Sequence, residues 1–225
     1  MRLRLPSSLP DEAVAAGSAA SRPDARATAR LSRRNQLGGT EGNEILTSAT
    51  AVVLTVLLLA EGVTIVRMRG LVSAHMFIGM VLIPPVLLKL ASTGYRFVRY
   101  YTGSRAYRAK GPPLLPLRLL APALVVTTVA VFVTGVLLLA AGHKSDTLLL
   151  VHKVSFIVWG VVFGVHFLAY TPRVVRSLRS DWGAARRASV PGAGIRAMLV
   201  SAALGTGVVA ALALLSLMNG WHAGH

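Results

Sequence analysis

The chain has 225 residues, of which 54% are hydrophobic and only 14% are charged. Its mean hydropathy of +0.62 exceeds that of a soluble domain, so the composition excludes a soluble globular protein and indicates a membrane protein. A formal charge of +16 would suggest nucleic-acid binding in a soluble protein. Here the basic residues lie in blocks between apolar runs, which fits loops beside anionic lipid and predicts no nucleic-acid partner.

The chain begins with a polar segment, residues 1–44, rich in Ala, Ser, Arg and Gly and without apolar periodicity. Such a segment cannot bury enough apolar surface to fold alone, so we expect a disordered cytoplasmic tail. No apolar core directly follows the first basic residues, as a secretory signal would require. The first apolar run is therefore expected to stay in the mature protein as an anchor.

Five apolar runs follow, each near the roughly 20 residues that a helix needs to cross a bilayer. They cover residues 45–66, 71–95, 119–141, 148–170 and 197–221. The runs are continuously apolar, whereas the strands of a membrane barrel alternate with a period of two. The sequence therefore predicts an all-α membrane protein with five transmembrane helices.

The positions of Lys and Arg predict the orientation of these helices. The tail carries seven of them, and the loops after the second and fourth runs carry six each. The remaining loops and the C-terminal end carry only Arg67, Arg69 and Lys144. We expect a bacterial inner (plasma) membrane protein with its N-terminus in the cytoplasm and its C-terminus outside.

An internal repeat relates the second run to the fourth. Shifting the sequence by 77 residues aligns His75 with His152 and Lys89 with His166. Both runs are predicted to cross from outside to inside, and each of the first two histidines lies four residues into its run, so the two imidazoles should lie at one depth. The first four helices are thus expected to form an up-and-down bundle of two repeated hairpins.

The predicted organisation has three parts. Residues 45–176 would form the four-helix core behind the tail of residues 1–44. Residues 177–225 would contribute a basic cytoplasmic loop, the fifth helix and a short outer tail. The fifth helix carries small residues on closely spaced turns, which is typical of a helix that packs on another helix or on a partner.

The histidine positions point to a haem. Because the chain has no cysteine, any cofactor must be held by His, Lys, Met or carboxylate groups. In an up-and-down bundle the second and fourth helices face each other diagonally, so His75 and His152 could bind a porphyrin iron as two neutral imidazoles. His166 lies 14 residues after His152, on the same stripe of its helix and about 21 Å further along the axis.

With these histidines in register, the chain resembles the four-helix b-type membrane cytochromes, which include cytochrome b561-like proteins and the cytochrome b subunits of hydrogenases and formate dehydrogenases. The resemblance implies haem b and transmembrane electron transfer, often coupled to quinone or to a redox partner protein. It further implies an electron-transfer subunit of an oxidoreductase rather than a stand-alone enzyme, and whether the chain is an enzyme stays open. Gly79 and Gly135 are small enough to let a porphyrin approach. Lys89 stands where a fourth histidine would complete a second site, so one haem near the outer face is expected rather than two.

Four further residues have two interpretations each. Glu61 could reach the outer interface and pair with Arg67 or Arg69, or it could orient an axial imidazole or take a proton from quinol. Lys89 could extend its ammonium to the inner surface, or it could meet a haem propionate or a quinone oxygen beside His166. Arg67 and Arg69 could contact lipid phosphates or haem propionates.

A second class of function fits the same sequence. Five helices without a large soluble domain also suit a cofactor-free membrane scaffold, a small transporter or an assembly factor, in which the histidines would be structural. The adjacent Pro84 and Pro85 predict a bend in the second helix in either case, because they remove two backbone donors.

Overall fold

The structure is a computed structural model that describes residues 38–109, 115–142, 145–181 and 190–221, with the side chains of 115–118 and 172–181 left aside. Within these ranges the chain forms helices and turns and no strand, which confirms the predicted all-α class. The expected disordered tail lies almost entirely outside the described residues. Its last part is helical, since the first described helix already begins at Gly39.

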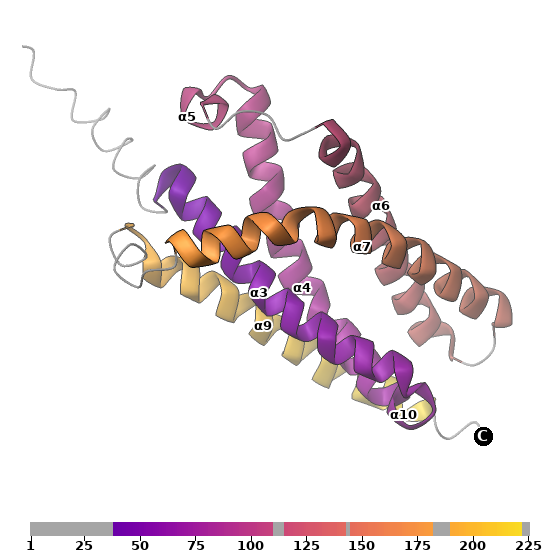
Figure 1. Cartoon of the computed structure of the whole chain (residues 1–225). Helices are drawn as coiled ribbons and strands as arrows, with labels where there is room; N and C mark the ends of the chain where they lie inside the picture. Colours follow the sequence, from indigo (N-terminus) through magenta and orange to yellow (C-terminus); the bar gives the residue numbers. More distant parts are fainter. Residues whose placement is uncertain (1–37, 110–114, 143–144, 182–189, 222–225) are drawn as a thin grey trace, which may run out of the picture. The chain divides into compact units, whose positions relative to one another are not determined.

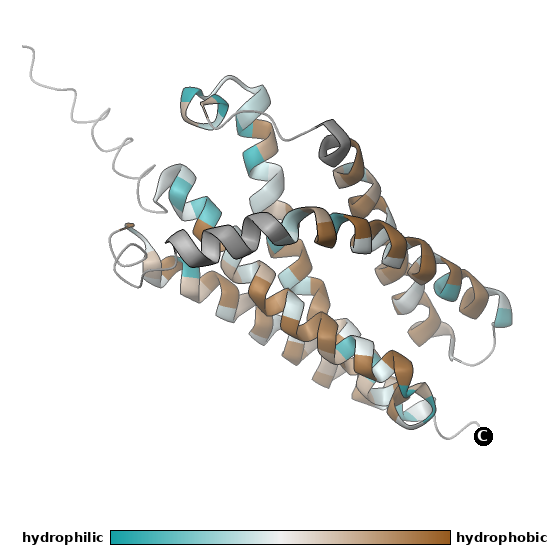
Figure 2. Ribbon diagram, in the orientation of Figure 1, coloured by the Kyte–Doolittle hydropathy of each residue, from teal (hydrophilic) through white to brown (hydrophobic). Residues whose placement is uncertain are grey.

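Five long helices account for most of the described chain (Figure 1). They are α3 (Gly39–Val66), α4 (Met68–Tyr101), α6 (Leu115–Ala141), α7 (Asp146–Asp181) and α9 (Ala193–Ala213). Each contains a stretch that is long and apolar enough to cross a membrane, as the sequence predicted. Figure 2 shows hydrophobic residues along these helices, with hydrophilic residues gathered at the start of α3 and around the short helix α5 (Arg105–Arg108).

Helices α3 and α4 form a tight hairpin in which Arg67 alone separates them. Inside α4, non-helical backbone angles occur at Leu71 (φ −128°, ψ 22°), one turn after the helix begins. Pro84 and Pro85 lie within the continuous helix, and Figure 1 shows the ribbon of α4 changing direction around its middle. This change of direction is in keeping with the bend expected at the prolines, although the helical assignment continues through them.

The long helices pack in two groups. One group contains α3, α4 and α9, and the other is the hairpin of α6 and α7. Helix α9 packs on α4 far more extensively than α6 does, so the fifth predicted helix belongs to the packed structure. The bundle of the first four helices remains a prediction.

A glycine explains the close approach of α9 to α4. A Cβ atom at Gly207 would lie 2.5 Å from the carbonyl oxygen of Val81, so only glycine fits where the two backbones meet. Val81 and the neighbouring Leu82 are both buried. The short helix α10 (Leu215–Gly220) then follows α9, and its Met218 is fully buried. Helix packing through small residues is typical of membrane proteins, where apolar side chains alone give little preference for protein over lipid.

Candidate functional site

His75 of α4 and His152 of α7 lie next to each other. Their ring centres are 6.4 Å apart and the ring planes are inclined at 67°. The two residues are far apart in the sequence and belong to different packing groups, yet they meet as the repeat predicted. They form the centre of the candidate site.

His75 is held by two residues of α3. Its Nδ1 lies 2.9 Å from Oε1 of Glu61 and 3.3 Å from Oγ1 of Thr64. The hydroxyl proton of Thr64 is donated to the backbone carbonyl of Glu61 at 2.6 Å, so this hydroxyl can only accept a hydrogen bond from His75. A carboxylate is likewise an acceptor. Both contacts therefore favour a proton on Nδ1 and leave the Nε2 lone pair of His75 free.

The side chain of Glu61 contacts His75, whereas its predicted role at a cofactor site stays a prediction. Glu61 is only 9% exposed, and its ion pair within the described chain is with His75 rather than with Arg67 or Arg69. Thr64 is buried as well, at 3% exposed. The carboxylate therefore has the position of a group that orients an imidazole.

His152 is held in a similar way by α6. Its Nδ1 lies 3.0 Å from Oγ1 of Thr134, which donates its own proton to the backbone carbonyl of Ala130 at 2.7 Å. Ser155 lies 3.2 Å from Thr134 and donates to the carbonyl of His152 at 2.9 Å. Thr134 is thus an acceptor toward Nδ1 of the imidazole, and the backbone carbonyl of Val131 is a second acceptor within reach of the ring.

The distance between the rings fits one metal ion between them. An imidazole nitrogen binds a metal ion at about 2 Å and lies roughly 1.1 Å from the ring centre, so two imidazoles that each point a nitrogen at one ion from opposite sides have ring centres about 6.2 Å apart. The observed 6.4 Å agrees with this value. Two neutral imidazoles are also the donor set that haem iron accepts in b-type sites.

The helices that carry the two histidines do not pack directly on each other. Helices in direct contact have axes about 8–10 Å apart. Among the described helices α4 and α7 are not a closely packed pair, because each packs mainly on other helices. The two imidazoles therefore lie next to each other although the helices that carry them are not packed on each other.

Gly79 and Gly135 contact the site in a way that the sequence did not predict. A Cβ at Gly135 would lie 3.1 Å from Cε1 of His152, so this glycine makes room for the imidazole itself. A Cβ at Gly79 would lie 3.6 Å from Oε1 of Glu61, an ordinary contact distance. Both glycines border residues of the site, and the predicted approach of a porphyrin to them is not tested by these contacts.

Lys89 and His166 lie apart from this site. The ammonium of Lys89 donates to the backbone carbonyl of Thr47 on α3 at 2.8 Å, an interaction that neither predicted interpretation included. The ring of His166 contacts that of Tyr170, with ring centres 4.5 Å apart and planes inclined at 32°, and its buried Nδ1 has no hydrogen-bond partner among the described residues. No histidine of the described chain faces His166 in the way that His75 faces His152.

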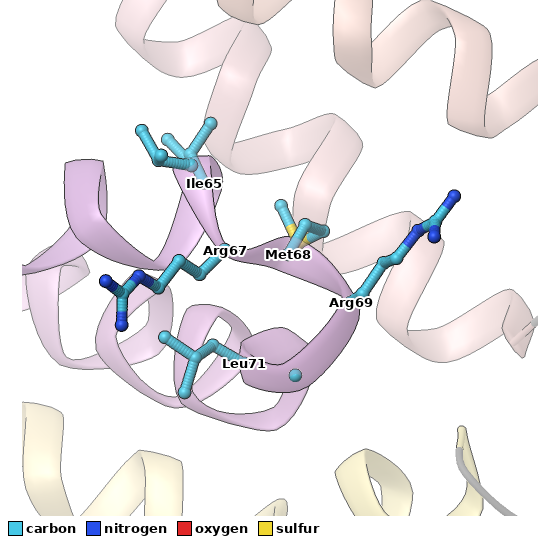
Figure 3. Close-up of a pocket in the computed structure, with 7 residues that line it drawn as sticks. Ile65, Arg67, Met68, Arg69 and Leu71 are labelled. Atoms are coloured by element: carbon cyan, nitrogen blue, oxygen red, sulfur yellow. The ribbon is translucent and has the colours of Figure 1, made fainter.

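Arg67 and Arg69 lie at the turn between α3 and α4. They line an open hollow of about 600 Å³ whose walls are residues 65–71 (Figure 3). Figure 3 shows the two side chains extending to opposite sides of the turn. Because consecutive residues of one turn form the hollow, it has the character of a surface depression rather than of a cofactor cavity.

The sequence did not identify Thr64 and Thr134, although both contact an imidazole nitrogen. A signal for them was nevertheless present. Thr64 follows Glu61 by three residues, nearly one helical turn, and Thr134 precedes Gly135 in an otherwise aliphatic stretch. Hydroxyl groups in apolar spans at the depth of the histidines are candidates for such contacts.

Comparison with known proteins found no matching family model, no matching curated protein and no matching solved structure.

Proposed function

We propose that this chain is a membrane-bound b-type cytochrome that binds one haem b between His75 and His152. The observation that supports the proposal most directly is the pair of imidazoles with ring centres 6.4 Å apart. Nδ1 of each ring contacts a protein acceptor, and Nε2 of His75 is left for iron.

In this proposal each residue of the site has a defined role. When bound, haem b supplies an iron that changes between ferrous and ferric forms and so carries one electron at a time. His75 and His152 would hold the iron through their imidazole nitrogens. Glu61 and Thr134 accept the Nδ1 protons and thereby fix the tautomer and direction of each ring. The buried charge of Glu61 also makes the His75 imidazole a stronger donor.

Lys89 and His166, the second pair of residues aligned by the repeat, support one haem rather than two. Lys89 is bound to the backbone of α3, and His166 has no imidazole opposite it among the described residues. A lysine in its ammonium form has no lone pair for iron. We therefore propose a single haem near the outer face in a bacterial plasma membrane, with the N-terminus cytoplasmic. The haem would exchange electrons with a quinone or a redox partner protein.

The test is an absorption spectrum of the full chain purified from haem-replete cells, recorded before and after dithionite. We expect a Soret band and a sharp α band in the reduced form. His75→Gly and His152→Gly should each abolish the low-spin spectrum, and free imidazole should restore it by entering the vacated position. His166→Gly is the matched control and should keep the spectrum.

Two results would contradict the proposal. A colourless wild-type protein would favour the cofactor-free scaffold, transporter or assembly factor. A haem spectrum that survives both histidine substitutions but disappears in His166→Gly would mean that the iron is bound at the other level.

A further inference from the structure

A cluster of arginine and tyrosine residues lies where α4 ends and α5 folds back. Between Glu61 and Asp146 the sequence contains no acidic residue, so the positive charge here has no nearby carboxylate in the same segment. The end of α4 carries Arg96 and Arg99, and α5 carries Arg105 and Arg108. We call Arg96, Arg99 and Tyr107 the arginine cluster, because the charges of both arginines act on the Tyr107 hydroxyl.

The turn after α4 is held by its own hydrogen bonds. The amide of Ser104 donates to the carbonyl of Arg99 at 3.1 Å, and Gly103 supplies the positive φ of 89° that reverses the chain. Nε of Arg108 donates to the carbonyl of Tyr100 at 3.3 Å. Arg108 therefore stabilises the turn through this hydrogen bond, which holds α5 near the last turns of α4.

Tyr107 is the buried residue of this turn. Its side chain is 9% exposed and meets the ring of Tyr95 edge to face, with ring centres 6.1 Å apart. Burial raises the pKa of Tyr107, the neighbouring Tyr95 raises it further, and the charges of Arg99 and Arg96 oppose this rise. Because the pKa is raised overall, the hydroxyl keeps its proton at neutral pH and can donate a hydrogen bond.

The guanidinium of Arg99 has one buried nitrogen without an acceptor. Its Nε is buried and has no hydrogen-bond partner among the described residues, and Arg99 forms no ion pair with any of them. An unsatisfied buried donor on a charged group is costly, so a bound acceptor would offset that cost. The arginine cluster therefore combines two guanidinium groups and a neutral hydroxyl donor. No carboxylate of the described residues forms an ion pair with it.

We propose that the arginine cluster binds the phosphate of an acidic phospholipid such as phosphatidylglycerol. Guanidinium groups match phosphate oxygens in geometry and charge. The cluster lies at the end of an apolar membrane-type helix, beside the exposed Phe97 and Tyr101, where aromatic rings and lipid head groups meet. An acidic lipid has no cationic head group to repel the arginines, so it should bind in preference to phosphatidylcholine.

The test is native mass spectrometry of the full chain in detergent, titrated separately with phosphatidylglycerol and with phosphatidylcholine. We expect preferential binding of phosphatidylglycerol. Arg99→Gln should weaken it about tenfold or more, the size expected for a hydrogen bond to a charged group. Tyr107→Phe keeps the ring contact with Tyr95 and should weaken binding about threefold to tenfold.

Two controls remove the same charge elsewhere. Arg105→Gln lies on α5 at an exposed position, and Arg69→Gln lies at the opposite end of α4. Both should bind phosphatidylglycerol as the wild type does. An equal loss in Arg99→Gln and Arg105→Gln would overturn the proposal, because it would show general attraction by net charge. Unchanged binding in both Arg99→Gln and Tyr107→Phe would overturn it as well.

Two further measurements separate lipid binding from phosphate binding and from a loss of folding. Inorganic phosphate at millimolar concentration should not displace the lipid, and displacement would identify a site for free phosphate instead. The melting temperature and the absorption spectrum of each variant report folding independently of lipid. Should Arg99→Gln fail to fold, Tyr107→Phe decides, since it alters one hydroxyl only.

Discussion

The carboxylate of Glu61 lies 2.9 Å from Nδ1 of His75, within a hairpin whose two helices are separated by a single residue. Both groups are polar and lie in segments that are apolar enough to cross a membrane. Each gives the other a hydrogen-bond partner, which the apolar side chains of these segments could not provide. The pair therefore connects α3 with the imidazole of His75 on α4.

If the chain binds haem as proposed, Glu61→Gln should raise the reduction potential of that haem by tens of millivolts. A carboxylate that accepts the ring proton of an axial imidazole strengthens the donor and stabilises ferric iron, and a nearby buried anion acts in the same direction. About 60 mV corresponds to a tenfold change for a one-electron couple. Redox titration of the α band measures the shift.

The control for this prediction is Glu44→Gln, the same change near the other end of α3. It should leave the midpoint potential unchanged. If Glu61→Gln keeps its haem and its wild-type midpoint, then the carboxylate does not act on the iron.

Thr134→Val should weaken haem binding because it removes the acceptor for Nδ1 of His152. Loss of such a partner typically lowers the affinity for a metal by about 10- to 100-fold. Haem titration of the apoprotein, followed at the Soret band, gives the affinity. Thr127→Val is the matched control in the same helix, since the Thr127 hydroxyl bonds only to carbonyls of its own helix. Equal affinities in the two variants would argue against the role assigned to Thr134.

Gly135→Ala should displace the imidazole of His152. The new methyl group would lie 3.1 Å from Cε1, which forces the ring or α6 to move by a few tenths of an ångström. We expect a broadened or shifted low-spin signal of the ferric form in electron paramagnetic resonance. Gly160→Ala adds a methyl group to α7 where no atom lies within 4 Å, and it should give the wild-type signal.

Gly207→Ala should destabilise the packing of α9 on α4. Its Cβ would overlap the carbonyl oxygen of Val81, and overpacking of this kind typically costs about 1–3 kcal/mol. The melting temperature in detergent should fall. Gly205→Ala is the matched control, because its Cβ would meet nothing within 4 Å. Alanine favours a helix more than glycine does, so helix propensity alone would not lower the melting temperature of either variant. A fall of equal size in both would mean that the crossing at Val81 is not its cause.

Tyr107 should titrate at a higher pH than an ordinary tyrosine. Burial raises its pKa in the folded protein above the unfolded value of about 10. The resulting stabilisation is therefore fully present below the unfolded pKa and is lost as the pH rises through the folded pKa. The absorbance difference at the tyrosinate band between wild type and Tyr107→Phe isolates this titration. A difference curve centred at or below the pKa of a free tyrosine would contradict the prediction.

The hydropathy pattern predicts the membrane-type helices well but not where they end. Apolar runs reveal only the part of a helix that suits hydrocarbon, whereas backbone hydrogen bonding continues into polar sequence. Thus α3 already begins at Gly39 rather than at residue 45, and Asn43 in its added turns donates to the carbonyl of Ser92 on α4. Likewise α7 continues to Asp181, beyond the apolar run that ends at residue 170.

The pairing of His75 with His152 could be predicted because a repeat fixes equal depth in two helices of the same direction. The bond from Lys89 to the carbonyl of Thr47 could not, since backbone acceptors are present at every position. The close approach of Gly207 to Val81 could not be predicted from the sequence either. A stripe of small residues predicts that a helix packs closely but does not name the helix it packs against.

The division of the helices into two packing groups has a consequence for assembly. The proposed iron would bind one ligand from α4 and one from α7, and so would connect the group of α3, α4 and α9 with the α6–α7 hairpin. A ligand that binds only the folded arrangement stabilises it by mass action. Cofactor supply would then control maturation, and protein made in haem-starved cells would retain its individual helices while losing the fixed alignment of the two groups.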